Sequence, residues 1–129
     1  MNYLLDTCIL IDHLRGYLPA CKWLVGCYED NEGDTLFYSA VTATELLAGA
    51  RGRDEAAVLK LLDVLTCVEV DRNIACRAGL LLRKWHGSHG LEMPDALLAA
   101  TAIEKSCSLV TRNSRHFPMD GLEIIKPYD

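Results

Sequence analysis

The chain has 129 residues, of which 50% are hydrophobic and 24% are charged, with nine glycines and four prolines. This length predicts one domain over residues 1–129, and the apolar content is sufficient for one packed core. The composition excludes a disordered or collagen-like chain. The formal net charge of −5 argues against a broad positive face of the kind that binds nucleic acid without sequence preference.

The sequence lacks the features of membrane and secreted proteins. Its apolar runs, such as residues 96–100, are far shorter than the roughly 18 residues that cross a bilayer. Residues 1–6 lack the basic and apolar regions of a secretory signal. We therefore expect a cytoplasmic protein without membrane contact, whose six cysteines are free thiols that pack as small apolar residues.

Short apolar runs alternate with longer segments of helical periodicity along the chain. The predicted strands are, in chain order, residues 3–5, 35–39, 67–70, 108–111 and 122–125. The predicted helices cover about residues 7–16, 19–28, 41–50, 54–65, 73–86 and 94–105. The acidic stretch 29–34 is expected to be a loop, Gly87–Gly90 to end the fifth helix, and Pro94 to begin the sixth.

Strands that are joined through helices require crossover connections, which place successive strands parallel to one another. The sequence therefore predicts an α/β fold with a mostly parallel sheet of about five strands and helices on both faces. Ligands of such sheets bind beyond the carboxyl ends of the strands.

Three acidic residues occur where solvated charges are not expected. Asp6 follows the first strand, Glu45 interrupts the apolar and small stretch 39–50, and Asp95 opens an apolar helix. Each residue also has a simple structural explanation. Asp6 could cap a helix, Asp95 could complement the helix dipole, and Glu45 could lie on an exposed helix face.

A chemical role for these three residues follows if their side chains meet. Three carboxylates from separate parts of an α/β fold, at least one of them at the carboxyl end of a strand, would repel one another, and a hard divalent cation relieves that repulsion. Mg²⁺ suits this type of ligand, because it takes one or two carboxylates and keeps waters that a phosphate can replace.

Four segments resemble the motifs of a known family, in the same order and at similar spacing across almost the whole chain. They are residues 3–11 (YLLDTCILI), 39–49 (SAVTATELLAG), 94–102 (PDALLAATA) and 109–117 (LVTRNSRHF). Together they resemble the motifs of PIN-domain ribonucleases. The size of the chain and the sequences of the motifs are most similar to those of the VapC-type toxins of toxin–antitoxin pairs. The resemblance implies a PIN-like three-layer sandwich and an Mg²⁺- or Mn²⁺-dependent endoribonuclease.

The resemblance also implies roles for residues at matching positions. Asp6 and Asp95 match direct metal ligands, and Glu45 matches the acid that reaches the metal through water or positions the attacking water. Asn113 stands where many relatives carry a fourth acidic residue. Its amide can coordinate a metal weakly or form a hydrogen bond, but it adds no charge. The small hydroxyl residues expected to support the carboxylates are Thr7, Ser39 and Thr111.

Substrate and partner contacts are expected on the same grounds. The arginines near the acidic motifs could hold RNA phosphates or could be ordinary surface charges; they are Arg51, Arg53, Arg112 and Arg115. His116 lies near the expected site, and the sequence assigns neither it nor Cys8 a role. The resemblance implies an RNA substrate, a cognate antitoxin and a homodimer. The alternative is a PIN-like module that binds RNA or protein without cleavage.

Overall fold

The computed structural model describes residues 1–30 and 33–129, and its centre is one sheet of five strands in the order β3-β2-β1-β4-β5. All four pairs of neighbouring strands are parallel. The strands are β1 (Asn2–Leu5), β2 (Thr35–Ser39), β3 (Thr66–Val68), β4 (Ser108–Val110) and β5 (Ile124–Ile125). The predicted α/β fold with a parallel sheet of five strands is therefore confirmed.

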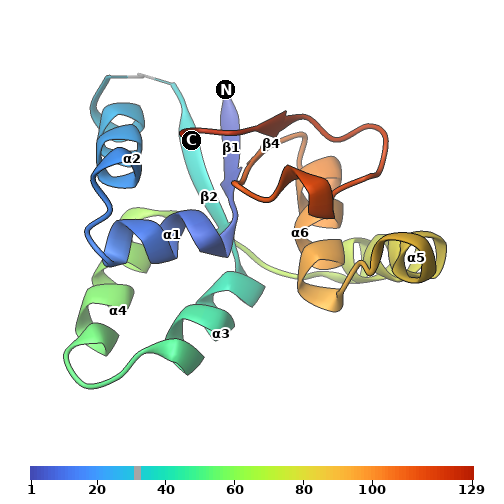
Figure 1. Ribbon diagram of the computed structural model, residues 1–129, viewed down its shortest axis with the longest axis horizontal. Helices are drawn as coiled ribbons and strands as arrows, with labels where there is room; N and C mark the ends of the chain where they lie inside the picture. The colour runs from blue at the N-terminus through green and yellow to red at the C-terminus, as the bar shows by residue number, and fades with distance from the viewer. Residues whose placement is uncertain (31–32) are drawn as a thin grey trace.

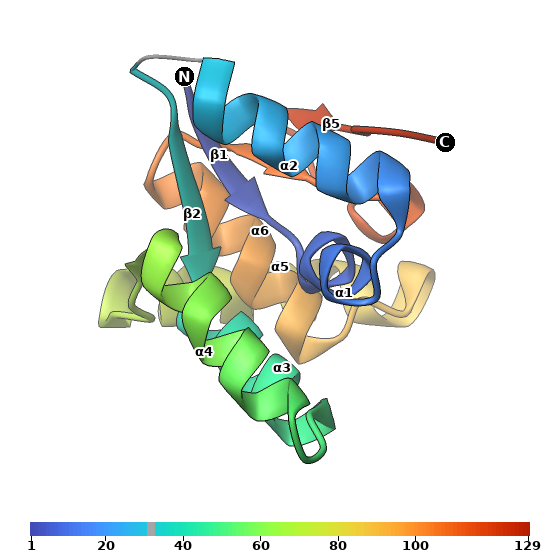
Figure 2. The same cartoon turned by 90° about the vertical axis from the view of Figure 1, so that its left-hand side faces the viewer.

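Helices cover both faces of this sheet. They are α1 (Thr7–Leu14), α2 (Leu18–Asp30), α3 (Ala40–Gly49), α4 (Asp54–Val64), α5 (Arg72–His89) and α6 (Met93–Glu104), with a short 3-10 helix at Ser114–His116. Figure 1 shows α1, α2 and α4 on one side of the strands and α5 and α6 on the other. In the view of Figure 2, α2 crosses in front of the sheet. The molecule thus has the three layers that the sequence predicts.

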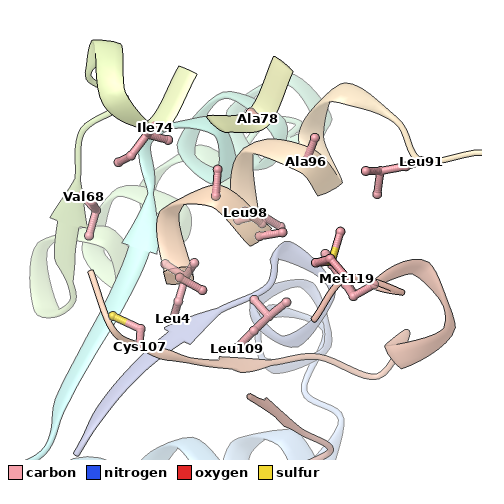
Figure 3. Close-up of a cluster of buried hydrophobic side chains, with 14 residues drawn as sticks. Leu4, Val68, Ile74, Ala78, Leu91, Ala96, Leu98, Cys107, Leu109 and Met119 are labelled. Carbon is pink, nitrogen blue, oxygen red and sulfur yellow. The ribbon is translucent and has the colours of Figure 1, made fainter. Parts of the chain in front are cut away.

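Alternation of side chains along the strands gives each face its own core. Leu4 and Leu109 are fully buried beneath α5 and α6, where Ile74 and Leu98 pack against them (Figure 3). The next residues along the same strands, Leu5 and Val110, are fully buried in the second core on the side of α1 to α4. Since burial of each large apolar side chain contributes about 1.5–3 kcal/mol, both faces hold the central strands in place.

Several element boundaries differ from the sequence prediction. The helix α5 continues through Gly87 to His89 and ends at Gly90, whose positive φ of 65° suits a left-handed cap. Strand β3 ends at Val68 because its partner β2 ends at Ser39. Helix α2 extends to Asp30, so the predicted loop 29–34 begins later than expected, and its residues 31 and 32 lie outside the described part of the chain.

The cysteines are all free thiols, as predicted, but they do not all pack in the core. Cys27 and Cys107 are buried, whereas Cys67 and Cys76 are exposed. None of the helices in the described ranges is long and apolar enough to cross a membrane.

Topology brings the predicted motifs to one edge of the sheet. Strands β1, β2 and β4 are neighbours, and Asp6, Ser39 and Thr111 stand at or just after their carboxyl ends. In Figure 1 the strands β1 and β2 descend toward α1 and α3, which begin where they end.

Candidate active site

Asp6 is fixed between the two central strands. Its backbone N–H donates to the carbonyl of Val110 at 2.9 Å, which continues the pairing of β1 with β4. Asp6 is the N-cap residue of α1, but its side chain makes no capping hydrogen bond. Its Oδ2 instead accepts a hydrogen bond of 2.7 Å from the hydroxyl of Thr111. The Asp6 carboxylate is therefore held by Thr111, directly after β4, and helix capping does not account for its position.

Thr111 connects Asp6 to the turn after β4. It is fully buried, and its hydroxyl accepts a hydrogen bond of 3.0 Å from the backbone N–H of Asn113 while donating to Asp6. This places the Asn113 backbone near the acidic edge. The Asn113 residue itself is exposed, and within the described ranges its side chain makes no hydrogen bond to a carboxylate.

Glu45 is held from α1 by a chain of hydroxyl groups. The Thr7 hydroxyl donates to Oε1 of Glu45 at 2.8 Å and lies 2.9 Å from the hydroxyl of Thr42. A hydroxyl has one proton, so Thr42 donates to Thr7, which in turn donates to Glu45. Thr42 was not predicted from the sequence; its position three residues before Glu45, on the same face of a helix, is the signal that could have identified it.

Asp95 lies in the first turn of α6, directly after Pro94, and is half-buried. Burial raises the pKa of its carboxyl group, and the negative charges of Asp6, Glu92 and Glu45 raise it further, while His116 partly offsets them. The His116 Nδ1 lies 3.8 Å from Oδ2 of Asp95. The three predicted acids therefore share one electrostatic environment, although each comes from a different helix or strand end.

Ser39 has a local role in the structure. Its side chain is fully buried, and its hydroxyl accepts a hydrogen bond of 3.1 Å from the backbone N–H of Val41 at the start of α3. In the part of the chain that the structure describes, no hydrogen bond links this hydroxyl to a carboxylate. Ser39 thus orients the helix that carries Glu45, rather than contacting the acidic group directly.

The arginines divide into two kinds. Arg51 and Arg53 are exposed near the turn between α3 and α4, and Arg115 is exposed on the 3-10 helix; over residues 1–30 and 33–129 none of the three forms an ion pair. Arg112, in contrast, pairs through Nε with Oδ2 of Asp12 on α1 at 2.7 Å. Asp12 was not predicted from the sequence, because its charge six residues after Asp6 gave no sign of its partner.

The donor atoms at this edge suit a hard divalent cation. Asp6, Glu45 and Asp95 offer carboxylate oxygens, and burial together with the charges of the other acids raises the pKa of Asp95, an effect that His116 offsets only in part. Considering the described residues alone, no three His, Cys, Asp or Glu side chains are arranged to ligate one ion together. Mg²⁺ takes one or two carboxylates directly and completes its shell with water, so two of these side chains would suffice as direct ligands.

Comparison with known proteins identifies relatives over almost the whole chain. The family model described as the PIN domain matches residues 3–121. Ribonuclease VapC19 of Mycobacterium tuberculosis is 39% identical over 117 residues, which cover 90% of this chain and 92% of that protein. Ribonuclease VapC10 of the same species is 38% identical over 125 residues, covering 96% of this chain and 90% of that protein.

Solved structures share the same architecture. A chain of a toxin–antitoxin complex from Klebsiella pneumoniae superposes with a TM-score of 0.77 at 26% identity, and 98% of each chain is covered. A chain of VapBC-1 from nontypeable Haemophilus influenzae gives a TM-score of 0.81 at 20% identity, again over 98% of each chain. At 20% identity, the similarity to VapBC-1 concerns the fold alone.

Proposed function

The chain belongs to the PIN-domain family, and from this premise we propose that it is a toxin ribonuclease, a single domain over residues 1–129 that hydrolyses RNA phosphodiester bonds. The observation that carries the proposal is a pair of hydrogen bonds that hold two of the acids, from Thr111 to Asp6 and from Thr7 to Glu45. Asp95 lies close enough that the charges of both acids add to the effect of burial in raising its pKa. The names of the two ribonuclease relatives support the substrate class. A module that only binds RNA or protein would gain nothing from three acids that repel one another.

The proposed cofactor is Mg²⁺ or Mn²⁺. Asp6 and Asp95 would bind it directly, and Glu45 would reach it through water, which agrees in donor type and number with a cation that keeps part of its water shell. When bound, such an ion lowers the pKa of a coordinated water and offsets the charge that develops on the phosphate during attack.

The residues of the chain would prepare this reaction by orientation. The Thr111 hydroxyl donates a hydrogen bond to Oδ2 of Asp6. Within the described residues no hydrogen bond reaches Oδ1 of Asp6, which remains available as a metal ligand. Thr7 occupies Oε1 of Glu45 in the same way, so that the second oxygen can orient the attacking water. Asn113 would contribute an amide oxygen without charge. The exposed side chains proposed to bind flanking phosphates are those of Arg51, Arg112 and Arg115.

Substitution of each acid by its amide tests the assignment. Asp6→Asn, Glu45→Gln and Asp95→Asn should each abolish metal-dependent cleavage of a labelled RNA, because each removes a negative charge and keeps the side-chain volume. Circular dichroism should show an unchanged fold. Asp63→Asn is the matched control, since Asp63 is an exposed carboxylate on α4. Full cleavage by purified Asp95→Asn would overturn the proposal.

We propose a cognate antitoxin as the protein partner, and a homodimer as the functional form. A groove of about 330 Å³ lies between α1, α3 and α4, where the apolar side chains of Ile11, Leu14 and Leu46 accompany Glu45 and Arg15. A helical or extended antitoxin segment could bury apolar residues there and present a basic side chain to Glu45 and its neighbours. The solved relatives that are toxin–antitoxin complexes support a partner of this kind.

The partner proposal is tested with the neighbouring reading frame. Co-expression of a small adjacent protein should give a stable complex in which RNA cleavage is suppressed, and sedimentation of the free chain at micromolar concentration should give the mass of a dimer. A monomer whose activity is unaffected by the neighbouring protein would contradict this part of the proposal without affecting the assignment of the acids.

A further inference from the structure

A second polar cluster lies beside the acidic centre and links three distant segments of the chain. The Oδ2 atom of Asp12, on α1, accepts a hydrogen bond of 2.8 Å from the Tyr128 hydroxyl and lies 2.7 Å from Nε of Arg112. Tyr128 follows β5, and its ring packs edge-to-face against that of Tyr17 at 5.6 Å between centroids. We refer to Arg112, Asp12 and Tyr128 as the arginine clamp.

The arginine clamp adjoins the site through both sequence and space. Arg112 directly follows Thr111, the residue that holds Asp6. Asp12 lies on α1, the helix whose N-cap residue is Asp6. The clamp and the acidic centre therefore share both α1 and the segment that follows β4.

The chemistry of the guanidinium group leaves it free to bind a second anion. Arginine has five N–H donors, and the contact to Asp12 is made through Nε. The Arg112 side chain is 42% exposed, whereas that of Asp12 is only 14% exposed. The inner side of the clamp is thus shielded from water, and its arginine remains accessible from solution.

We infer that Asp12 and Tyr128 are positioning residues that fix the Arg112 guanidinium at the rim of the acidic centre, where it binds a phosphate of the RNA next to the scissile bond. This inference rests on the proposed ribonuclease function. An unrestrained arginine loses rotamer freedom when it binds phosphate, and the hydrogen bonds of the clamp remove that freedom in advance. Tyr128 acts through Asp12, because its hydroxyl fixes the carboxylate that holds the arginine.

The Tyr128 hydroxyl is a donor at neutral pH. Burial raises its pKa, and its hydrogen bond to Asp12 and the charge of that carboxylate raise it further, while the charge of Arg112 lowers it.

The substitution Tyr128→Phe tests the role of the hydroxyl while keeping the ring against Tyr17. Because a flanking phosphate contact contributes equally to substrate and transition state, KM for a labelled single-stranded RNA should rise about 3- to 10-fold with kcat unchanged. Asp12→Asn should act in the same direction. Tyr28→Phe is the matched control, since the Tyr28 residue is 65% exposed on α2, and its KM should equal that of the wild type.

A double-substitution cycle separates positioning from a merely structural effect. In an Arg112→Ala background, Tyr128→Phe should produce no further rise in KM, because the residue through which it acts is gone. The inference is wrong if Tyr128→Phe leaves KM unchanged, if it raises KM equally with and without Arg112, or if it lowers kcat alone. Thermal melting followed by circular dichroism confirms that the variants compared are folded.

Direct binding distinguishes failure of the inference from failure of the proposed function. The Kd of a fluorescent single-stranded RNA, measured by anisotropy in the presence of chelator, should rise with Tyr128→Phe and not with Tyr28→Phe. If the wild type does not cleave RNA with Mg²⁺ or Mn²⁺, the ribonuclease proposal fails and the Kd comparison still decides the clamp. If the wild type cleaves and Tyr128→Phe changes neither KM nor Kd, the clamp alone is refuted.

Discussion

The hydroxyl group of Thr111 bonds both Asp6 and the backbone of Asn113, and its removal gives a quantitative prediction. Thr111→Val keeps the shape of the side chain but deletes the donor to Asp6 at 2.7 Å and the acceptor for the Asn113 N–H at 3.0 Å. A hydrogen bond to a charged group contributes about 1.5–3 kcal/mol. The Asn113 residue is exposed, so water can replace the second bond at little cost. We therefore expect the free energy of unfolding to fall by about 2–3 kcal/mol.

Thr101→Val supplies a control with the same chemical change. Thr101 is also fully buried, and its hydroxyl donates at 2.7 Å to the carbonyl of Leu97 within α6. That carbonyl is already paired in the helix, because the backbone N–H of residue 101 falls in the regular i to i−4 pattern. Loss of the Thr101 hydroxyl should therefore cost under about 1 kcal/mol.

Urea unfolding of the wild type and both variants, in the presence of chelator, measures the difference. We expect Thr111→Val to be less stable than Thr101→Val by at least about 1 kcal/mol, and to lose RNA cleavage because Asp6 is no longer oriented. Equal stabilities of the two variants would show that the Thr111 hydroxyl does not hold Asp6, and would refute the reasoning for this side of the site.

Three further predictions concern charge and backbone conformation. The raised pKa of Asp95 favours the protonated carboxyl in the fold, so the stabilising contribution of that carboxyl is present below the unfolded pKa and is lost as the pH rises through the folded pKa. The free energy of unfolding of Asp95→Asn relative to the wild type, measured in urea with chelator, should therefore increase as the pH rises above about 4 and should not reverse. Asn113→Asp adds a charge and should strengthen Mn²⁺ binding in calorimetric titration without RNA; no gain would place residue 113 outside the metal centre. Gly90→Ala should lower the free energy of unfolding, measured by thermal melting, by about 1 kcal/mol, because alanine is strained at the positive φ of 65°. A Cβ at this position meets no atom within 4 Å, so steric contact adds nothing to this cost. An unchanged stability would contradict the cap conformation.

Local patterns in the sequence determined the elements and their inner faces. The neighbours Leu4 and Leu5 point into opposite cores because successive strand residues alternate, and the spacing of apolar residues located most of the helices in the described part of the chain. Parallel pairing followed because helices between strands require crossovers. Asp6, Glu45 and Asp95 were identifiable as candidates because each interrupts, ends or opens an apolar segment, and the resemblance of the four motifs favoured a metal-binding role over the simple alternatives.

Only the tertiary structure decided which groups meet. The strand order β3-β2-β1-β4-β5 makes β1 and β4 neighbours, and thereby brings Thr111 to Asp6 across 105 residues. Thr7 and Thr42 meet across 35 residues, and the same topology turns Arg112 toward Asp12 and Tyr128 rather than leaving it free beside the acids. Sequence patterns report on neighbours within one or two turns of helix, whereas a hydrogen bond between distant side chains depends on the order in which strands pair, and that order is fixed by the packing of the whole domain.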